Sequence, residues 1–289
     1  MTLLSALQSS NSLLFFVCFL VGLFVGSFLN VVVYRLPIMM EKDWRRECKE
    51  FLELEPDKVE KQFNLMVPRS ACPSCGNLIS AWANIPVISW LLLRGKCGNC
   101  KNNISAQYPL VELLTAILSL LVAMKFGATW QTVFALLFTW ALICLALIDF
   151  HTTLLPDSIT LPLMWLGLVI SVAPVFVNAH QALIGAAAGY MILWIIFQTF
   201  KLITGKEGMG YGDFKLLAAL GAWMGWMKLP LIVLLSSLTG AVIGIMMMVR
   251  FKHQRDKPIP FGPYLAIAGW IALMWGDEIV KLYTSQFTV

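Results

Sequence analysis

Eight long apolar stretches, separated by more polar segments, constrain this chain more than any other feature. A helix needs about 20 apolar residues to cross the ~30 Å hydrocarbon core of a bilayer, and most of the stretches approach that length. Only 13% of the 289 residues are charged, whereas about a quarter are charged in a soluble globular protein. The sequence therefore predicts an all-α polytopic membrane protein with about eight transmembrane helices. The stretches are 13–33, 110–124, 133–148, 159–177, 182–200, 214–227, 229–249 and 261–275.

The basic residues predict the orientation of these helices. With eight spans, all but three of the 21 Lys and Arg residues fall on one side, the exceptions being Lys125, Lys228 and Lys281. The positive-inside rule makes the crowded side cytosolic and places the N-terminus outside. The first stretch lacks a basic leader region and a small-residue cleavage site, so we expect a retained helix. Topology and anionic lipid account for the net charge of +5, and no nucleic-acid partner is expected.

One soluble segment of substantial size lies between the first and second stretches. It opens with a stretch of both charge signs over 41–62, which predicts an exposed helix. From Pro68 it turns to Cys, Pro, Gly and Asn, which favour loops. We therefore divide the chain into a first transmembrane helix (1–34), a cytosolic insert (35–107) and a transmembrane helical bundle (108–289).

The insert carries two pairs of cysteines with metal-ligand spacing. Cys72 and Cys75 form one Cys-x2-Cys pair, and Cys97 and Cys100 form the other. Two such pairs complete a tetrahedron around Zn²⁺, and a closed four-cysteine site is structural because it leaves no open position for water. Two disulfides are the alternative, but disulfides seldom persist in the cytosol. We expect zinc, with a glycine easing the turn in each pair (Gly76 and Gly98).

Two aspartates stand at helix ends on the same predicted side of the membrane. Asp149 ends the third stretch and Asp213 opens the sixth. Either one alone could be an ordinary helix-end residue, but an ionisable group at the edge of a span is costly and marks a functional candidate. Together they favour a paired-carboxylate site, in which one group acts as base toward water and the other as acid toward a peptide carbonyl. Because a helix C-terminus disfavours a negative charge, the shared proton is expected on Asp149.

Three further residues are candidates for contact with a substrate. Gly210 and Gly212 lack a Cβ, so an extended substrate backbone could approach closely beside Asp213; a flexible loop is the alternative. Glu112, near the start of the second stretch, could bind basic residues or an amine, or be a plain helix-start acid.

These motifs resemble those of one membrane protease family. The sequence Gly210-Tyr-Gly-Asp213 resembles the Gly-x-Gly-Asp signature of intramembrane aspartic proteases. The stretch from Asp149 to Asp157 is similar to the first catalytic motif of the type IV prepilin peptidase family. Further blocks similar to that family, in the right order along nearly the whole chain, are Ser27–Pro37, Tyr108–Glu112, Pro260–Tyr264 and the paired-cysteine insert. One departure is Gln107, where the family pattern has an arginine before Tyr-Pro.

The resemblance implies a bifunctional enzyme of the bacterial inner membrane. It would cut the basic leader from prepilins or pseudopilins after a glycine, with Asp149 and Asp213 as the catalytic pair, and serve type IV pili or type II secretion. It would then methylate the new N-terminal amine with S-adenosylmethionine. The insert has no glycine-rich nucleotide fingerprint of the Rossmann kind, so the residues that hold this cofactor stay unassigned.

Three alternatives remain open from the sequence. One is a peptidase without methyltransferase activity, although the cysteine insert argues against it. Another is a proton-coupled transporter, but that predicts midplane charges and broken helices in matching halves, of which the sequence shows few signs. The third, a structural assembly factor, leaves the aspartate pair without a purpose.

Overall fold

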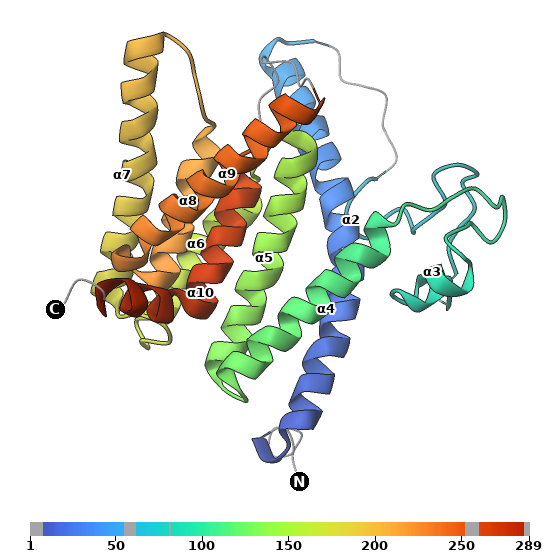
Figure 1. Ribbon diagram of the computed structural model, residues 1–289. Helices are drawn as coiled ribbons and strands as arrows, with labels where there is room; N and C mark the ends of the chain where they lie inside the picture. The colour runs from blue at the N-terminus through green and yellow to red at the C-terminus, as the bar shows by residue number, and fades with distance from the viewer. Residues whose placement is uncertain (1–7, 55–61, 81, 252–259, 286–289) are drawn as a thin grey trace. The chain divides into compact units, whose positions relative to one another are not determined.

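Helices form the framework of the protein in the computed structural model, which describes residues 8–54, 62–80, 82–251 and 260–285 (Figure 1). Each of the eight apolar stretches lies largely within one helix, although the stretches 159–177 and 214–227 run past the ends of theirs. In chain order these helices are α2 (Asn11–Phe51), α4 (Gln107–Phe126), α5 (Trp130–Thr152), α6 (Asp157–Ser171), α7 (Ala179–Thr204), α8 (Tyr211–Met224), α9 (Leu229–Phe251) and α10 (Gly262–Ser285). One short helix, α3 (Ile88–Leu92), lies in the insert.

Within the part of the chain that the structure describes, five helical segments are long and apolar enough to cross a membrane. They are α2, α4, α5, α7 and the segment Trp226–Met246, which includes most of α9, while α6 is apolar but shorter. The chain therefore fits a multi-pass membrane protein, and the count of eight spans stays a prediction.

The chain forms two compact units, Met1–Ala128 and Thr129–Val289. In the first unit α2 packs closely against α4, because Gly22 and Gly26 on α2 have no Cβ to keep the helices apart. A Cβ at Gly26 would lie 2.7 Å from the Cα of Glu112. Small residues that let backbones approach are the usual means of helix association in membranes. Residues 108–128, which the sequence grouped with the bundle, thus pack in this unit.

Helix α2 does not end where the first apolar stretch ends. It continues through Pro37 to Phe51, a total of 41 residues. At 1.5 Å per residue it is about 60 Å long, twice the hydrocarbon thickness, so its charged C-terminal part extends beyond the membrane. That part is stabilised by helical ion pairs, for example Arg45–Glu41 at 2.6 Å.

A buried arginine folds the insert back onto α2. The guanidinium of Arg35 donates hydrogen bonds to the backbone carbonyls of Asn64 (2.9 Å) and Pro68 (2.7 Å), and it lies over the ring of Phe63. Three carbonyl contacts, counting a longer one to Leu65, satisfy a charge that would otherwise be costly to bury.

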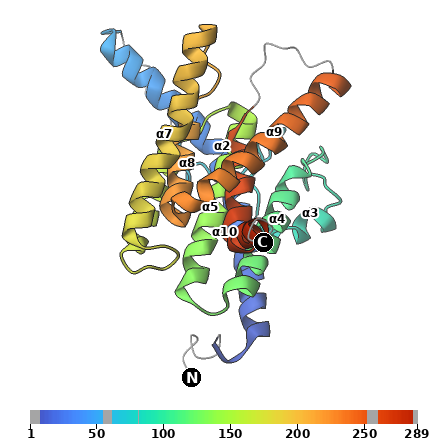
Figure 2. The same ribbon diagram turned by 60° about the vertical axis from the view of Figure 1, so that its left-hand side comes forward.

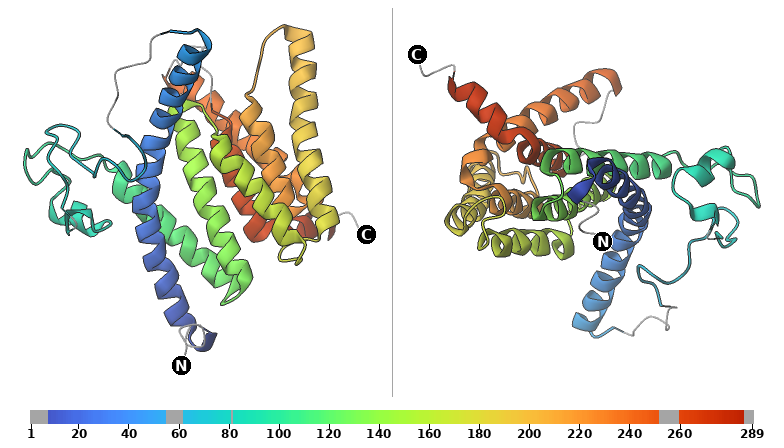
Figure 3. Two further views of the ribbon diagram at one scale, coloured as in Figure 1. Left: turned by 180° about the vertical axis from the view of Figure 1, so that it is seen from behind. Right: turned by 90° about the horizontal axis from the view of Figure 1, so that it is seen from below.

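The second unit is built around α8. Its residues from Phe214 to Met224 are almost all buried, because α6, α7 and α10 pack around it (Figures 2 and 3). The α7–α8 contact is the closest, since a Cβ on Gly185 would collide with the backbone of Gly221. An apolar helix enclosed on several sides is shielded from lipid, which explains how 14 residues can be so hydrophobic and yet too short for an ordinary span.

Candidate active site and metal centre

The four cysteines of the insert converge on one point. Their Sγ atoms all lie within 4.8 Å of one another. Each pair sits on a tight turn closed by an isolated β-bridge, Ala71 with Leu78 and Lys96 with Asn103. The prediction that these residues form one cluster is confirmed, and a four-cysteine cluster of this kind is the donor set of structural zinc.

The two turns reach the same geometry with different residues. After the second cysteine of each pair the backbone is left-handed, at Gly76 (φ +68°) and at Lys101 (φ +61°). The prediction that Gly98 eases the second turn is therefore wrong, because Lys101 takes the strained position. A non-glycine residue in this conformation costs about 1–2 kcal/mol.

The thiols themselves fit a cation. Backbone N–H groups of Cys75 and Ser74 lower the pKa of the Cys72 thiol, and those of Cys100 and Asn99 lower the pKa of Cys97. The N–H of Asn102 acts in the same direction on Cys100, but desolvation and the three neighbouring thiols outweigh it and raise its pKa to about 11. Four thiolates this close together would repel one another, so a bound cation would compensate their charge. Zn²⁺ held by Cys72, Cys75, Cys97 and Cys100 would supply that charge and fix the fold of the insert.

Glu112 lies buried in the second turn of α4. Its Oε2 accepts a 2.7 Å hydrogen bond from the backbone N–H of Val87, in the insert, and the side chain of Ser27 also interacts with it. Val87 has φ +59°, an outlier for a β-branched residue. The carboxylate therefore holds a strained turn of the insert against α4, and its role toward a substrate stays a prediction.

Asp149 and Asp213 come together in the second unit. Asp149 is 5% exposed near the end of α5, Asp213 is 7% exposed in the first turn of α8, and the two carboxylates interact electrostatically. Two buried acids from different helices that interact in this way cannot both ionise readily, which is the property that a shared-proton carboxylate pair requires. The arrangement supplies a base and an acid at one place.

Each carboxylate also meets a glycine N–H at the start of a helix. The N–H of Gly262, the first residue of α10, donates to Asp149 Oδ2 at 2.9 Å. The N–H of Gly210, which caps α8, faces the carboxylate of Asp213, as in a capping box. Sequence reasoning assigned a helix N-terminus to Asp213 alone, so the helix-end argument for a proton on Asp149 was incomplete.

Leu155 packs against both Gly212 and Gly262. An added Cβ would lie 2.7 Å from Leu155 Cβ at Gly212, and 3.1 Å from Leu155 Cδ2 at Gly262. The α5–α6 connection therefore packs on the starts of both α8 and α10. The role of Gly212 that the structure shows is close packing, and contact with a substrate stays a prediction for Gly210 and Gly212.

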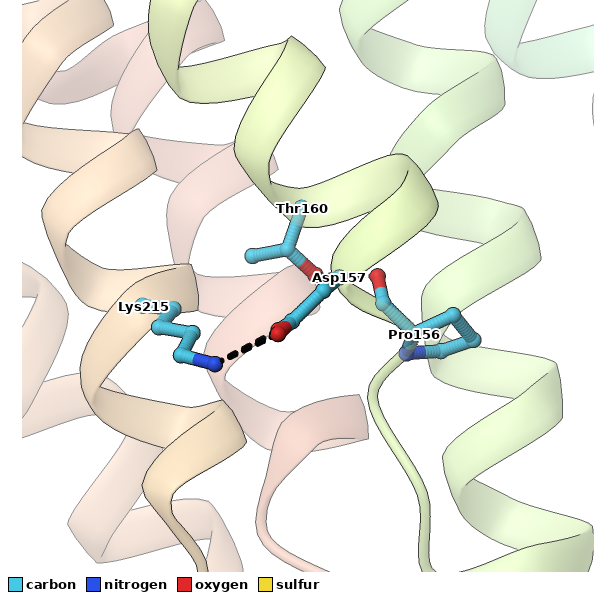
Figure 4. A network of polar contacts seen from close by, with 4 residues as sticks. All are labelled: Pro156, Asp157, Thr160 and Lys215. Atoms are coloured by element: carbon cyan, nitrogen blue, oxygen red, sulfur yellow. Dashed lines mark hydrogen bonds and ion pairs between the residues drawn. The ribbon is translucent and has the colours of Figure 1, made fainter. Parts of the chain in front are cut away.

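An ion pair joins α6 to α8 beside this site (Figure 4). Lys215 Nζ lies 2.7 Å from both carboxylate oxygens of Asp157, the first residue of α6. The hydroxyl of Thr160 donates to the carbonyl of Pro156 in the same turn. The sequence identified Asp157 as a helix-start acid but gave no partner, because the two residues are 58 positions apart.

Helices packed around a buried carboxylate pair, with a separate four-cysteine module, are the arrangement expected of an intramembrane aspartic protease. The bacterial Peptidase A24 N-terminal domain matches residues 20–126, and the type IV leader peptidase family matches residues 136–245. The chain belongs to the type IV leader peptidase family.

Relatives from several bacteria are similar over nearly their whole length. The prepilin leader peptidase/N-methyltransferase of Aeromonas hydrophila is 56% identical over 95% of both chains. Its namesake from Stutzerimonas stutzeri is 57% identical over 95% of this chain and 96% of that one. The protein of that name from Pseudomonas aeruginosa is 56% identical over 95% of both. No solved structure matches this chain.

Proposed function

We propose that this protein removes the leader peptide of type IV prepilins or pseudopilins and then N-methylates the new N-terminal residue. The observation that carries the peptidase part is the pair of buried, interacting carboxylates of Asp149 and Asp213. Its membership in the family and the names of its relatives support both activities.

In this mechanism the two aspartates divide the work. One ionised carboxylate takes a proton from a water molecule, which attacks the scissile carbonyl carbon, while the protonated partner donates to the carbonyl oxygen. The proton then passes to the leaving amine and the pair returns to its shared-proton state. Gly262 and Gly210 hold the carboxylates by their N–H groups, and the open backbone at Gly210 offers room for an extended substrate.

The remaining parts of the proposal concern the cofactors and the location of the protein in the cell. S-adenosylmethionine would supply the methyl group, and zinc in the four-cysteine module would be structural. In an eight-span topology the side rich in Lys and Arg would face the bacterial cytosol, and the N-terminus would lie outside. The insert and the carboxylate pair would then act at the cytosolic face of the inner membrane. Glu112 is a further candidate for binding the basic leader.

Leader cleavage by the purified protein tests the proposal. Asp149→Asn and Asp213→Asn keep the shape of the side chain but replace the ionisable carboxyl group by an amide. Each should lower the rate of prepilin cleavage by roughly 10²–10⁴-fold. Asp277→Asn, in the second half of α10, is the matched control and should cut normally. Mass spectrometry of the product reports cleavage and methylation separately.

Each outcome of this experiment distinguishes the proposed function from an alternative. Normal cleavage by both variants would show that the aspartates are helix-end residues. Cleavage without methylation, with S-adenosylmethionine present, would leave a peptidase only. A folded, zinc-loaded wild-type protein that cuts no prepilin would favour a transporter or an assembly factor.

A further inference from the structure

The insert exposes a group of large apolar side chains around α3. Trp82, Ile88, Leu91 and Leu92 are 82%, 55%, 61% and 79% exposed, and together we call them the α3 face. Exposed apolar groups of this kind on a polar segment mark an interaction surface.

The α3 face is fixed to the rest of the insert. The indole N–H of Trp90, within α3, donates to the carbonyl of Ile104 at 3.2 Å, and Gly95 packs directly on its ring. Gly95 lies two residues before Cys97, so α3 and the four-cysteine cluster belong to one local structure.

The hydrogen bond from Val87 to Glu112 sets the level of α3 along α4. Val87 directly precedes α3, and its N–H reaches Glu112, five residues after the start of α4 at Gln107. That places the attachment about 7–8 Å along a helix whose 20 residues span roughly the 30 Å of a hydrocarbon core. The α3 face therefore begins where interfacial helices are buried, about 5–10 Å into the boundary between headgroups and acyl chains.

The charge of the surrounding segment matches anionic lipid. Residues 68–107 contain no Asp or Glu, and their four basic residues are Arg69, Arg94, Lys96 and Lys101. Arg94 and Lys96, which are exposed, lie shortly after the end of α3 at Leu92. A four-cysteine site loaded with Zn²⁺ carries two negative charges, so the segment remains net positive. Basic residues near an anionic surface contribute about 1 kcal/mol each.

We propose that the α3 face is a membrane-docking surface that seats in the headgroup layer of an anionic bilayer and holds the four-cysteine module against the membrane. The apolar side chains enter the acyl boundary, and Arg94 and Lys96 meet the lipid phosphates. This inference goes beyond the proposed function, since it depends on α4 spanning the membrane and on neither aspartate.

The depth of Leu92 in a bilayer tests the proposal. A nitroxide is attached to an unnatural ketone amino acid that replaces Leu92 in the full chain, in nanodiscs containing phosphatidylglycerol. Its accessibility to oxygen and to a water-soluble nickel chelate is compared with two references in α2. Phe16, 60% exposed in the apolar part, reports lipid, and Glu47, exposed in the extension beyond the membrane, reports water.

We expect the Leu92 label to favour oxygen over nickel, between the two references, and to move toward the aqueous value in nanodiscs of phosphatidylcholine alone. In Arg94→Gln/Lys96→Gln protein the label should lose this dependence on lipid charge. Zinc content is measured in every sample to confirm that the module is intact.

Three results would overturn the proposal. A Leu92 label as accessible to nickel as Glu47 in anionic nanodiscs would show that the face stays in water. Protection that appears only after uncleaved prepilin is added would assign the face to the substrate. Dipolar broadening that depends on two labelled chains per nanodisc would assign it to a second copy.

Discussion

Replacing Gly262 by alanine perturbs the candidate site chiefly at Asp149, with a lesser contact at Leu155 Cδ2, 3.1 Å from the new Cβ. The new Cβ would lie 2.6 Å from Asp149 Oδ2 and 3.1 Å from Asp149 Cγ. Ordinary van der Waals contact begins at 3.4 Å, so the carboxyl group must retreat by about 0.8 Å. A retreat of that size removes the 2.9 Å hydrogen bond from the Gly262 N–H, because contacts near 3.6 Å no longer count as hydrogen bonds.

The size of the effect follows from the bond that is lost. A hydrogen bond to a charged group contributes about 1.5–3 kcal/mol. If the transition state relies on it, kcat/KM for leader cleavage should fall roughly 10- to 150-fold, since about 1.4 kcal/mol is a tenfold change in rate. A misplacement of about 1 Å in a catalytic group costs a similar factor.

The same helix provides the control. Gly276 lies in the second half of α10, and the nearest contact of a Cβ there would be the flexible Lys228 side chain, at 3.1 Å from its Cδ. Gly276→Ala should cut prepilin like the wild type. Thermal unfolding in detergent shows whether each variant is folded. A folded Gly262→Ala protein with wild-type kcat/KM would refute the positioning role, and equal losses in both variants would point to α10 as a whole.

Two further predictions concern the metal module and the ion pair. Lys101→Gly should relieve the left-handed strain and stabilise the zinc-loaded module by about 0.5–1 kcal/mol, less than the full strain because glycine loses more backbone entropy on folding. Gly76→Ala, whose new Cβ would meet no atom within 4 Å, should destabilise the module similarly. In chelator competition the two variants should shift by roughly two- to fivefold in opposite directions, and no shift in either would show that neither backbone is strained. The Asp157–Lys215 pair is partly exposed, with side chains 52% and 30% accessible, so a double-mutant cycle with Asp157→Asn and Lys215→Met should give a coupling of about 0.2–1 kcal/mol by thermal unfolding. Cleavage should continue in Asp157→Asn, and its complete loss would mean that the pair belongs to the catalytic machinery.

The sequence predicted the parts of this protein that depend on local pattern. The length of the apolar stretches predicted eight helices, and the Cys-x2-Cys spacing predicted the cysteine cluster. Both signals lie within short segments of the chain. The continuation of α2 past Pro37 was missed, since the change from apolar to charged residues indicates where a helix leaves the membrane and not where it ends.

Contacts between distant residues could not be predicted in this way. Gly262 is 113 positions from Asp149, and no periodicity connects them. The signal was present only as a glycine between Phe261 and Pro263 at the start of an apolar stretch. A helix start exposes N–H groups that need acceptors, so an acid elsewhere in the chain is a reasonable partner to seek, but the sequence does not say which one.

Among the described residues, three buried acids at helix ends share one physical solution. Glu112 accepts from the N–H of Val87, Asp149 accepts from Gly262, and Asp213 faces Gly210. A carboxylate and a backbone N–H are each costly to leave unpaired near lipid, by several kcal/mol. Pairing them removes both costs, and it needs no basic side chain in a region with few charges.

The same pairing ties separate segments together. Glu112 fixes the insert to α4, and Asp149 fixes the start of α10 to the end of α5. Replacing any of these acids by a neutral isostere therefore weakens a hydrogen bond between segments and also removes a negative charge. For Asp149 the Gly262→Ala variant separates the two effects, because it keeps the ionisable carboxyl group and removes its hydrogen bond to the start of α10. A large loss of cleavage in that variant would show that the position of Asp149, in addition to its charge, is what the fold of the second unit provides.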